Sequence, residues 1–376
     1  MNRARFTVAV LAAAAVILSA PYVSQFRNYV RGAFPDHHVL ILGAIVGGSI
    51  VLAIVAALVR IRDRRLLRFG AIGAALVVGT IYSILTSSSD PHVAAVERFH
   101  FVQYGLITFL FYRAWRPLGD AGVLILPVLA AMLTGTIEEW FQWFIPGRVG
   151  VMEDVFLNWV AIACGLLFSI GVDPPRWKTL AMSGRSLRHS GAAAALFVAV
   201  FGLFFDAVHL GHRIHDPRIG TFTSLYTADD LQAHAQDRSA RWKIDPPIDR
   251  TRLAREDQYR TEGIQHVQER NRAWDAGEFD RAWRENLILE AYYAPVLQRG
   301  HEWPAEQAED ASLRAAPAGG SRAESFVSAA YPYAVHAWSP FAFWTCVIAM
   351  AAALLLLTRQ RSAGDQETRR PGVVSQ

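Results

Sequence analysis

The sequence predicts an all-α fold: a polytopic transmembrane helical bundle of about eight spans, with a mainly helical extracytoplasmic insert. Three observations predict it. Apolar residues make up 52% of the 376-residue chain, and they gather in runs of roughly 17–23 residues, the length that crosses a hydrocarbon core. Basic residues are concentrated in the short connections beside these runs. Between Leu210 and Val335, in contrast, no such run occurs and charged residues are dense.

The expected spans are identified by their apolar composition and length. They are Phe6–Val23, Val39–Val59, Gly70–Leu85, Phe99–Trp115, Gly122–Phe144, Val155–Val172, Gly191–Val208 and Ala337–Leu357. The first resembles a signal peptide, because Met1–Arg5 precede a short apolar run that ends in Leu18-Ser19-Ala20. Pro21 directly follows the one plausible cleavage site, which favours an uncleaved first helix.

Loop charge predicts the orientation of these spans. The basic residues that flank them are Arg3, Arg5, Arg60, Arg62, Arg64, Arg65, Arg68, Arg113, Arg116, Arg176, Lys178, Arg185, Arg188, Arg359, Arg361, Arg369 and Arg370. With eight spans, all of them fall on one side of the membrane. The positive-inside rule makes that side cytoplasmic, so we expect a plasma or inner membrane protein with both termini in the cytoplasm.

The same map divides the chain into segments. They are three N-terminal spans (1–90), a central core of three spans (91–175), a cytoplasmic loop and seventh span (176–209), an extracytoplasmic insert (210–336), an eighth span (337–358) and a cytoplasmic tail (359–376). Within the insert, Arg252–Trp274 and Asp280–Leu297 show helical spacing of apolar residues, which predicts two or three amphipathic helices. Pro246-Pro247 indicates a break before them, and Ala315–Arg322 is typical of a linker.

Composition also excludes several function classes. The pI is about 9.2, but the positive charge flanks apolar runs, a pattern that orients helices and does not indicate nucleic-acid binding. Cys164 and Cys346 are the only cysteines, and both lie in apolar segments, so no disulfide framework is expected. No phosphate-binding loop, dinucleotide motif or paired-cysteine metal motif is present, and we expect no cofactor.

Polar and ionisable residues inside the central spans are the strongest functional signal, because such groups are unfavourable in a bilayer unless paired or functional. Near the start of the fourth span, Glu97, His100 and Tyr104 follow one another at helical spacing and share a face. Near the end of the fifth span, Glu139 and Gln142 are also three residues apart.

The sixth span begins with a matching set, in which Asp154 and Asn158 are one turn apart. The predicted orientation places all three groups at the outer leaflet. The connection Ile145–Gly150 is too short to separate the fifth and sixth spans, so their polar residues are expected to converge. Arg148, the only cation in that connection, is the natural partner of Asp154 or Glu139.

These residues carry a resemblance to a known family. The run Ile137-Glu138-Glu139-Trp140-Phe141-Gln142, followed by Pro146-Gly147-Arg148, Asp154, Asn158 and Gly165, resembles the signature of the VanZ-like family. His100, with Tyr104 and Gly105, matches the family's upstream histidine. A glycine common in the family three residues after the asparagine is Ala161 here, and the resemblance covers only about 98–168. It implies a cell-envelope membrane protein associated with resistance to the glycopeptide teicoplanin, without a settled biochemical activity.

Two interpretations of this polar cluster remain open: a hydrogen-bond network that fixes helix packing, or a ligand-binding or catalytic site. For the site, His100, Glu139 and Asp154 are the candidate acid/base residues. Arg148 is a candidate ligand for a phosphate or carboxylate. The ligand-binding or structural set is Glu97, Tyr104, Gln142, Arg148 and Asn158. Glu138 and Glu153 are expected to be solvated neighbours.

A second group lies near the end of the seventh span, where Asp206, His209 and His212 recur at three-residue spacing, with His215 beyond. On one helical face such residues could bind zinc. No second ligand set accompanies them, and the prediction is that no metal binds.

Three function classes therefore remain open. The favoured one is a non-enzymatic protein, associated with the lipid bilayer, that binds an amphiphilic or lipid-linked molecule at the outer leaflet. The alternative is a membrane enzyme that acts on a lipid-linked envelope precursor by acid/base chemistry. A transporter is the third; only Pro127 and Gly135 in the fifth span hint at the broken helices typical of that class.

Overall fold

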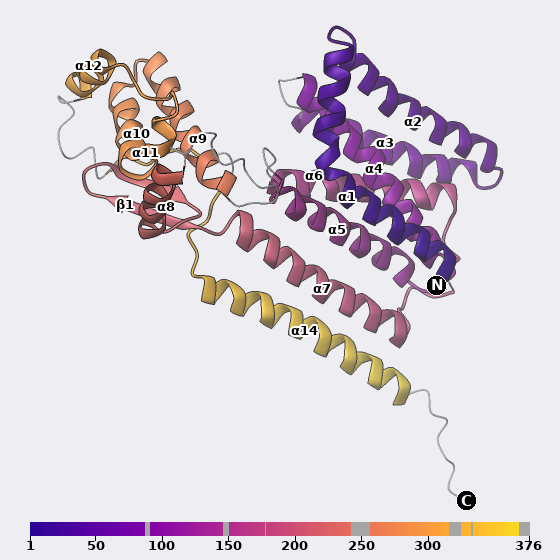
Figure 1. Ribbon diagram of the computed structural model, residues 1–376. Coiled ribbons are helices and arrows are strands. Elements are labelled where there is room, and N and C mark those ends of the chain that lie inside the picture. Colours follow the sequence, from indigo (N-terminus) through magenta and orange to yellow (C-terminus); the bar gives the residue numbers. More distant parts are fainter. Residues whose placement is uncertain are drawn as a thin grey trace, which may run out of the picture. The chain divides into compact units, whose positions relative to one another are not determined.

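The computed structural model describes residues 1–86, 91–145, 150–176, 178–241, 256–315, 325–331 and 334–367. The chain forms two compact units (Figure 1). The first, the helical unit, comprises Met1–Gln142, Gly150–Phe204 and Trp344–Gln376. The second, the insert unit, comprises Trp143–Val149 and Phe205–Phe343.

The helical unit is built from long, mostly apolar helices. They are α1 (Arg3–Ala33), α2 (His38–Arg60), α3 (Arg65–Thr86), α4 (Pro91–Trp115), α5 (Gly122–Gln142), α6 (Met152–Val172), and most of α7 (Gly184–Val208) and α14 (Pro340–Glu367). Seven of them are long and apolar enough to cross a membrane: all but α4. The predicted all-α, multi-pass membrane fold is confirmed.

The fourth expected span does form a helix, α4, yet it does not belong to those seven. Its position explains its polarity. α4 packs against α1, α2, α3, α5 and α6, and Tyr104, Ile107 and Phe111 on α4 are at most 4% exposed. A helix surrounded by other helices presents little surface to lipid, so it can carry polar groups that find partners inside the bundle.

Close contact between α4 and α6 depends on small residues. A Cβ atom added to Gly165 on α6 would lie 2.8 Å from the Cα of Gly105 on α4 and 3.0 Å from its carbonyl oxygen. Glycine at this position therefore lets the two backbones touch, as is common where helices pack inside membranes.

The insert unit is mainly helical, as predicted. Its helices are α8 (Ala228–Arg241), α9 (Glu256–Asp275), α10 (Phe279–Tyr292), α11 (Ala294–Leu297) and α12 (Ala305–Ala315). The expected helix Asp280–Leu297 is divided between α10 and α11. Pro295 explains the break, because it has no N–H to continue the α10 hydrogen-bond ladder and is instead accommodated in the first turn of α11. Pro246-Pro247 and most of the expected linker lie outside the described residues.

Sequence reasoning missed a small antiparallel hairpin, β1 (His212–Asp216) and β2 (Gly220–Ser224), in which Ile214 pairs with Phe222. Ile214 and Phe222 are buried and belong to the main apolar core of the unit, together with residues of α8, α9, α10 and α11. Each strand has only one apolar side chain, Ile214 or Phe222, so the sequence shows no alternating pattern that would predict the hairpin.

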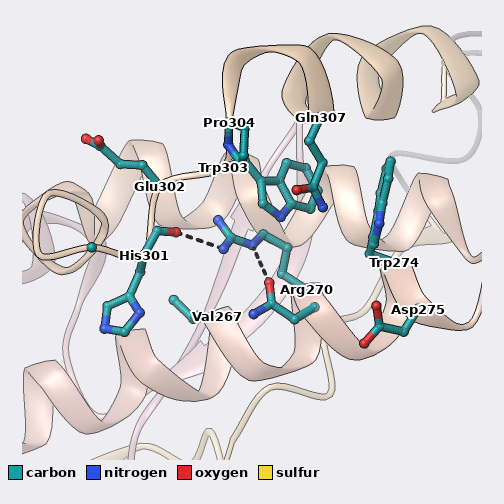
Figure 2. A pocket seen from close by; sticks show the side chains of 11 residues that line it. Val267, Arg270, Trp274, Asp275, His301, Glu302, Trp303, Pro304 and Gln307 are labelled. Atoms are coloured by element: carbon teal, nitrogen blue, oxygen red, sulfur yellow. Dashed lines mark hydrogen bonds between the residues drawn. The ribbon is translucent and has the colours of Figure 1, made fainter.

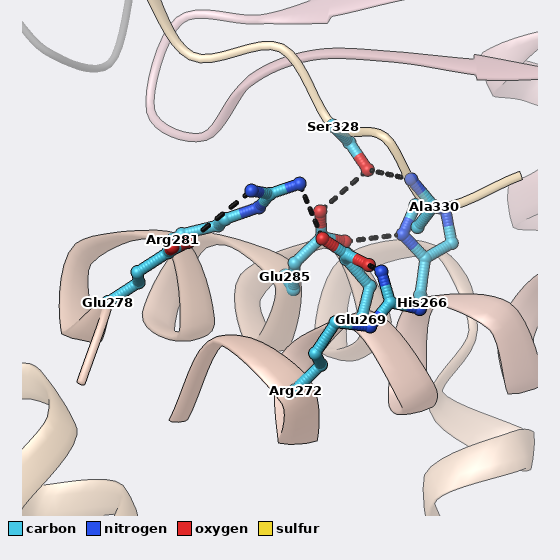
Figure 3. Close-up of polar contacts among 8 residues, drawn as sticks. All are labelled: His266, Glu269, Arg272, Glu278, Arg281, Glu285, Ser328 and Ala330. Carbon is cyan, nitrogen blue, oxygen red and sulfur yellow. Dashed lines mark hydrogen bonds and ion pairs between the residues drawn. The ribbon is translucent and has the colours of Figure 1, made fainter. Parts of the chain in front are cut away.

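Hydrogen bonds satisfy two buried glutamates of the insert unit. The carboxylate of Glu285 on α10 lies 2.6 Å from His266 Nδ1 and accepts a hydrogen bond from Ser328 at 2.6 Å (Figure 3). Glu262 on α9 is also fully buried and accepts hydrogen bonds from Ser224, the Leu225 amide, Tyr293 and Tyr331. Burial raises the pKa of Glu262 despite these donors.

The α4–α6 contact generates a stability prediction. Gly165→Ala should destabilise the protein by about 1–3 kcal/mol, because the new methyl group would have to displace backbone atoms of α4. Gly105→Ala is the matched control, since a Cβ there meets nothing within 4 Å. Thermal unfolding of the purified protein in detergent measures both; equal melting temperatures for the two variants would contradict the predicted contact.

Candidate functional site

The polar residues of α5 form the centre of the candidate site. Glu138, Glu139 and Gln142 lie in the last turn of the helix, and each is at most 5% exposed. Because Gln142 follows these glutamates by four and three residues, its side-chain amide can reach both. Its Nε2 lies 3.1 Å from an oxygen of Glu138 and 3.1 Å from an oxygen of Glu139.

α4 contributes a phenol and an imidazole to the same region. The hydroxyl of Tyr104, which is fully buried, donates a hydrogen bond to Glu138. One turn earlier, the ring of His100 meets that of Tyr104 edge to face, with 6.2 Å between the ring centroids. The helical spacing predicted from the sequence therefore does bring His100 and Tyr104 onto one face.

α6 completes the cluster from the other side. Asn158, also fully buried, has its Nδ2 atom 3.5 Å from Glu139, a long hydrogen bond. Room for this approach comes from Gly135 on α5, where an added Cβ would lie 3.2 Å from the Tyr104 ring and 3.3 Å from the Asn158 amide nitrogen. We call Tyr104, Glu138, Glu139, Gln142 and Asn158 the polar junction.

The polar junction brings together four residues that the sequence singled out: Tyr104, Glu139, Gln142 and Asn158. One expectation was wrong. Glu138 is not a solvated neighbour of the site but a buried member, 5% exposed, because it faces Tyr104 on α4. The signal available in the sequence was its spacing of four residues from Gln142. Glu153, in contrast, is exposed as expected.

The remaining predicted residues lie at the edge of the junction or outside the described part. Asp154 and Glu97 are partly exposed, one turn nearer the ends of α6 and α4 than Asn158 and His100. Arg148 lies outside the described residues, so its predicted pairing with Asp154 or Glu139 stays a prediction.

The opposite end of the helical unit carries cationic side chains. Arg116, just after α4, pairs with Asp173, which follows α6, at 2.6 Å. Arg68 on α3 donates to the carbonyl oxygens of Gly171 and Val172 at the end of α6. The polar junction lies near the start of α6, whereas these arginines contact residues at and after its end, so the junction and the arginines are at opposite ends of α6.

The histidine group after the seventh span does not form the helical face that could have bound zinc. α7 ends at Val208, and His212 and His215 belong to strand β1, so Asp206, His209 and His212 do not share a helix. His209 is buried, and its Nδ1 atom lies 2.7 Å from the carbonyl oxygen of Ala334. Among the described residues, no three His, Cys, Asp or Glu side chains are placed to hold a metal ion.

Comparison with protein families, curated proteins and solved structures gives no match for this chain. The chemistry of the junction must therefore be argued from its own groups. Two neighbouring carboxylates, two amides and a phenol can exchange hydrogen bonds with hydroxyl, amide or ammonium groups of a ligand. Carboxyl and imidazole groups can also transfer protons. Both capacities require the junction to be intact.

The contact between Tyr104 and Glu138 is tested by Tyr104→Phe. This variant keeps the ring but removes the donor to a buried carboxylate, and the free energy of unfolding should fall by about 1–3 kcal/mol. Tyr29→Phe is the matched control, because Tyr29 is 71% exposed. Denaturant unfolding of both variants measures the difference, and an unchanged stability of Tyr104→Phe would refute the hydrogen bond.

Proposed function

We propose that this chain is an integral membrane protein of the bacterial cell envelope that binds an amphiphilic or lipid-linked molecule at the polar junction. One observation carries the proposal: hydrogen-bonding side chains from α4, α5 and α6 converge at one end of a largely apolar bundle. Isolated charges would be excluded from such a place. A set this rich in carboxylate and amide groups supports recognition of a polar headgroup.

The resemblance to the VanZ-like family gives the proposal its biological direction. Glu139, Gln142 and Asn158, which match the family pattern, are also members of the buried junction. We therefore propose that binding at this site alters susceptibility to glycopeptide antibiotics such as teicoplanin. The family resemblance and the junction support this choice. A transporter is less favoured, because transporters use interrupted helices and the described helices show few interruptions.

The proposed location in the membrane follows from charge. Arg68 and Arg116 lie at the end of the bundle opposite the junction, and basic residues favour the cytoplasmic side. This arrangement supports a junction at the outer leaflet of the plasma or inner membrane. α7 carries Arg185 and Arg188 near its start, so residues 210–336 would follow on the extracytoplasmic side, with both termini in the cytoplasm.

The functional prediction concerns antibiotic susceptibility. In a bacterial host that becomes less susceptible to teicoplanin when it produces this protein, Glu139→Gln should return susceptibility to that of cells without it, because the substitution removes the carboxyl group at the centre of the junction. Glu153→Gln, an equally conservative change at an exposed glutamate near the start of α6, should have no effect.

The amount of each variant in the membrane fraction is measured in parallel. Full protection by Glu139→Gln at a wild-type protein level would contradict the proposed site.

An enzyme is distinguished from a binder by comparing envelope precursors in cells with wild-type protein and with His100→Asn. A precursor that accumulates only in the variant would favour the acid/base alternative.

The proposed orientation is tested with an impermeant thiol reagent on intact cells. In a background with Cys164→Ala and Cys346→Ala, a cysteine introduced by Ala276→Cys in the insert unit should react. A cysteine introduced by Arg62→Cys, between α2 and α3, should react only after permeabilisation. The reverse pattern would overturn the orientation. Both positions are exposed, so burial does not interfere with labelling.

A further inference from the structure

The insert unit contains a pocket of about 320 Å³, within the size range of small-molecule sites. Figure 2 shows how it is built: Arg270 and Trp274 project from α9, His301 and Trp303 lie in the connection before α12, and Gln307 lies on α12. We propose that this pocket binds a small molecule with one carboxylate, held by Arg270, and with hydroxyl or ammonium groups at its other end.

Arg270 is the residue on which the proposal depends. It is only 2% exposed, and burial lowers its pKa to about 10. The charge of Glu290 acts on Arg270 in the opposite direction. Asn286 connects the two side chains: it accepts a hydrogen bond from Arg270 at 2.9 Å and donates one to Glu290 at 2.7 Å. Among the described residues, no carboxylate lies within ion-pair distance of the Arg270 guanidinium.

Other buried arginines of the insert unit differ in this respect. Arg284, 7% exposed, has Asp280 at 3.1 Å, and Arg238, 2% exposed, has Asp237 at 3.6 Å. A buried cation without a carboxylate is unfavourable unless something else supplies the charge. The contrast therefore indicates that Arg270 is held ready for an anion that the chain itself does not provide.

The geometry of Arg270 suits a carboxylate. A guanidinium has five N–H donors, and three are used here, by Asn271, Asn286 and the carbonyl oxygen of His301. Two donors therefore remain, the number that a two-point contact with a carboxylate needs. These three bonds also fix the plane of the guanidinium. Gly300, with φ at +85°, forms the turn that directs the His301 carbonyl toward Arg270.

The walls of the pocket define the rest of the ligand. The guanidinium lies 4.6 Å from the centre of the Trp303 ring, and that ring is 5.5 Å from the ring of Trp274. The Nε1 atom of Trp303 is buried and makes no hydrogen bond among the described residues. Asp275 and Glu302, both exposed, also line the pocket; their carboxylates can accept hydrogen bonds from hydroxyl or ammonium groups and disfavour a second anion.

Acidic sugars and free amino acids both combine a carboxylate with such donors, so D-glucuronate and L-alanine are the probes of choice. Isothermal titration of the full-length protein in nanodiscs should detect binding of at least one of them, and no binding of D-glucose, which lacks the carboxylate. Glucuronate alone would identify a sugar acid as the ligand class, and alanine alone an amino acid. If neither probe binds, or if glucose binds as tightly, the proposal is overturned.

Three variants test the role of Arg270. Arg270→Lys keeps the charge but loses the two-point geometry and should weaken binding about tenfold or more. Arg272→Gln, on the same helix but outside the pocket, is the matched control and should bind like the wild type. Gln307→Trp should block the pocket without changing Arg270, which keeps the test valid if Arg270→Lys fails to fold. Wild-type affinity in both Arg270→Lys and Gln307→Trp would overturn the proposal.

This inference is independent of the polar junction. The pocket and the junction share no residue, and titration of the probes does not depend on antibiotic susceptibility. Loss of protection in Glu139→Gln and loss of probe binding in Arg270→Lys can therefore succeed or fail separately.

Discussion

The burial of a carboxylate inside an apolar bundle is the constraint on which the helical unit depends. Glu139 is fully enclosed, and such a group is tolerated only where donors surround it. It accepts a hydrogen bond from Gln142 within α5, and the bond from Asn158 links the end of α5 to the start of α6. The neighbouring bond from Tyr104 to Glu138 adds α4. Gly135 and Gly165 allow these helices to approach, because a Cβ atom at either position would press on Tyr104 and Asn158 or on the backbone of α4.

The insert unit follows the same rule but leaves one exception. Glu262 and Glu285 are fully buried, and each has hydrogen bonds from neighbouring hydroxyl, amide or imidazole groups. Arg270, unlike the buried arginines Arg238 and Arg284, has only neutral partners among the described residues. Because Arg238 and Arg284 each have a carboxylate partner, the absence of one beside Arg270 among the described residues indicates a place where a ligand could supply the negative charge. The polar junction is proposed as a site because many polar groups converge there. The insert pocket is proposed because Arg270 has no carboxylate partner among the described residues.

Much of the fold could be predicted because the dominant signal, long apolar runs between basic loops, reflects the bilayer directly. The convergence of Tyr104, Glu139, Gln142 and Asn158 was predictable because helical spacing and a short connection leave few arrangements. Glu138 was missed because residues adjacent in sequence usually face different ways, and here both faces of α5 are packed. The β hairpin was missed because the three-residue spacing of Asp206, His209 and His212 was interpreted as helical. The Arg270 pocket could not be predicted, because its residues come from segments far apart in the sequence. Arg270 on α9 and its hydrogen-bond partner His301 are 31 residues apart, and no spacing rule brings such residues together.

The most direct test of the central claim is native mass spectrometry of the protein released from nanodiscs made with the host's own envelope lipids. The account predicts that wild-type protein and Glu153→Gln retain one amphiphilic molecule, and that Glu139→Gln, folded to the same extent, loses it. Retention of the same molecule by Glu139→Gln, or a wild-type protein that retains none, would contradict the claim that the polar junction is a binding site.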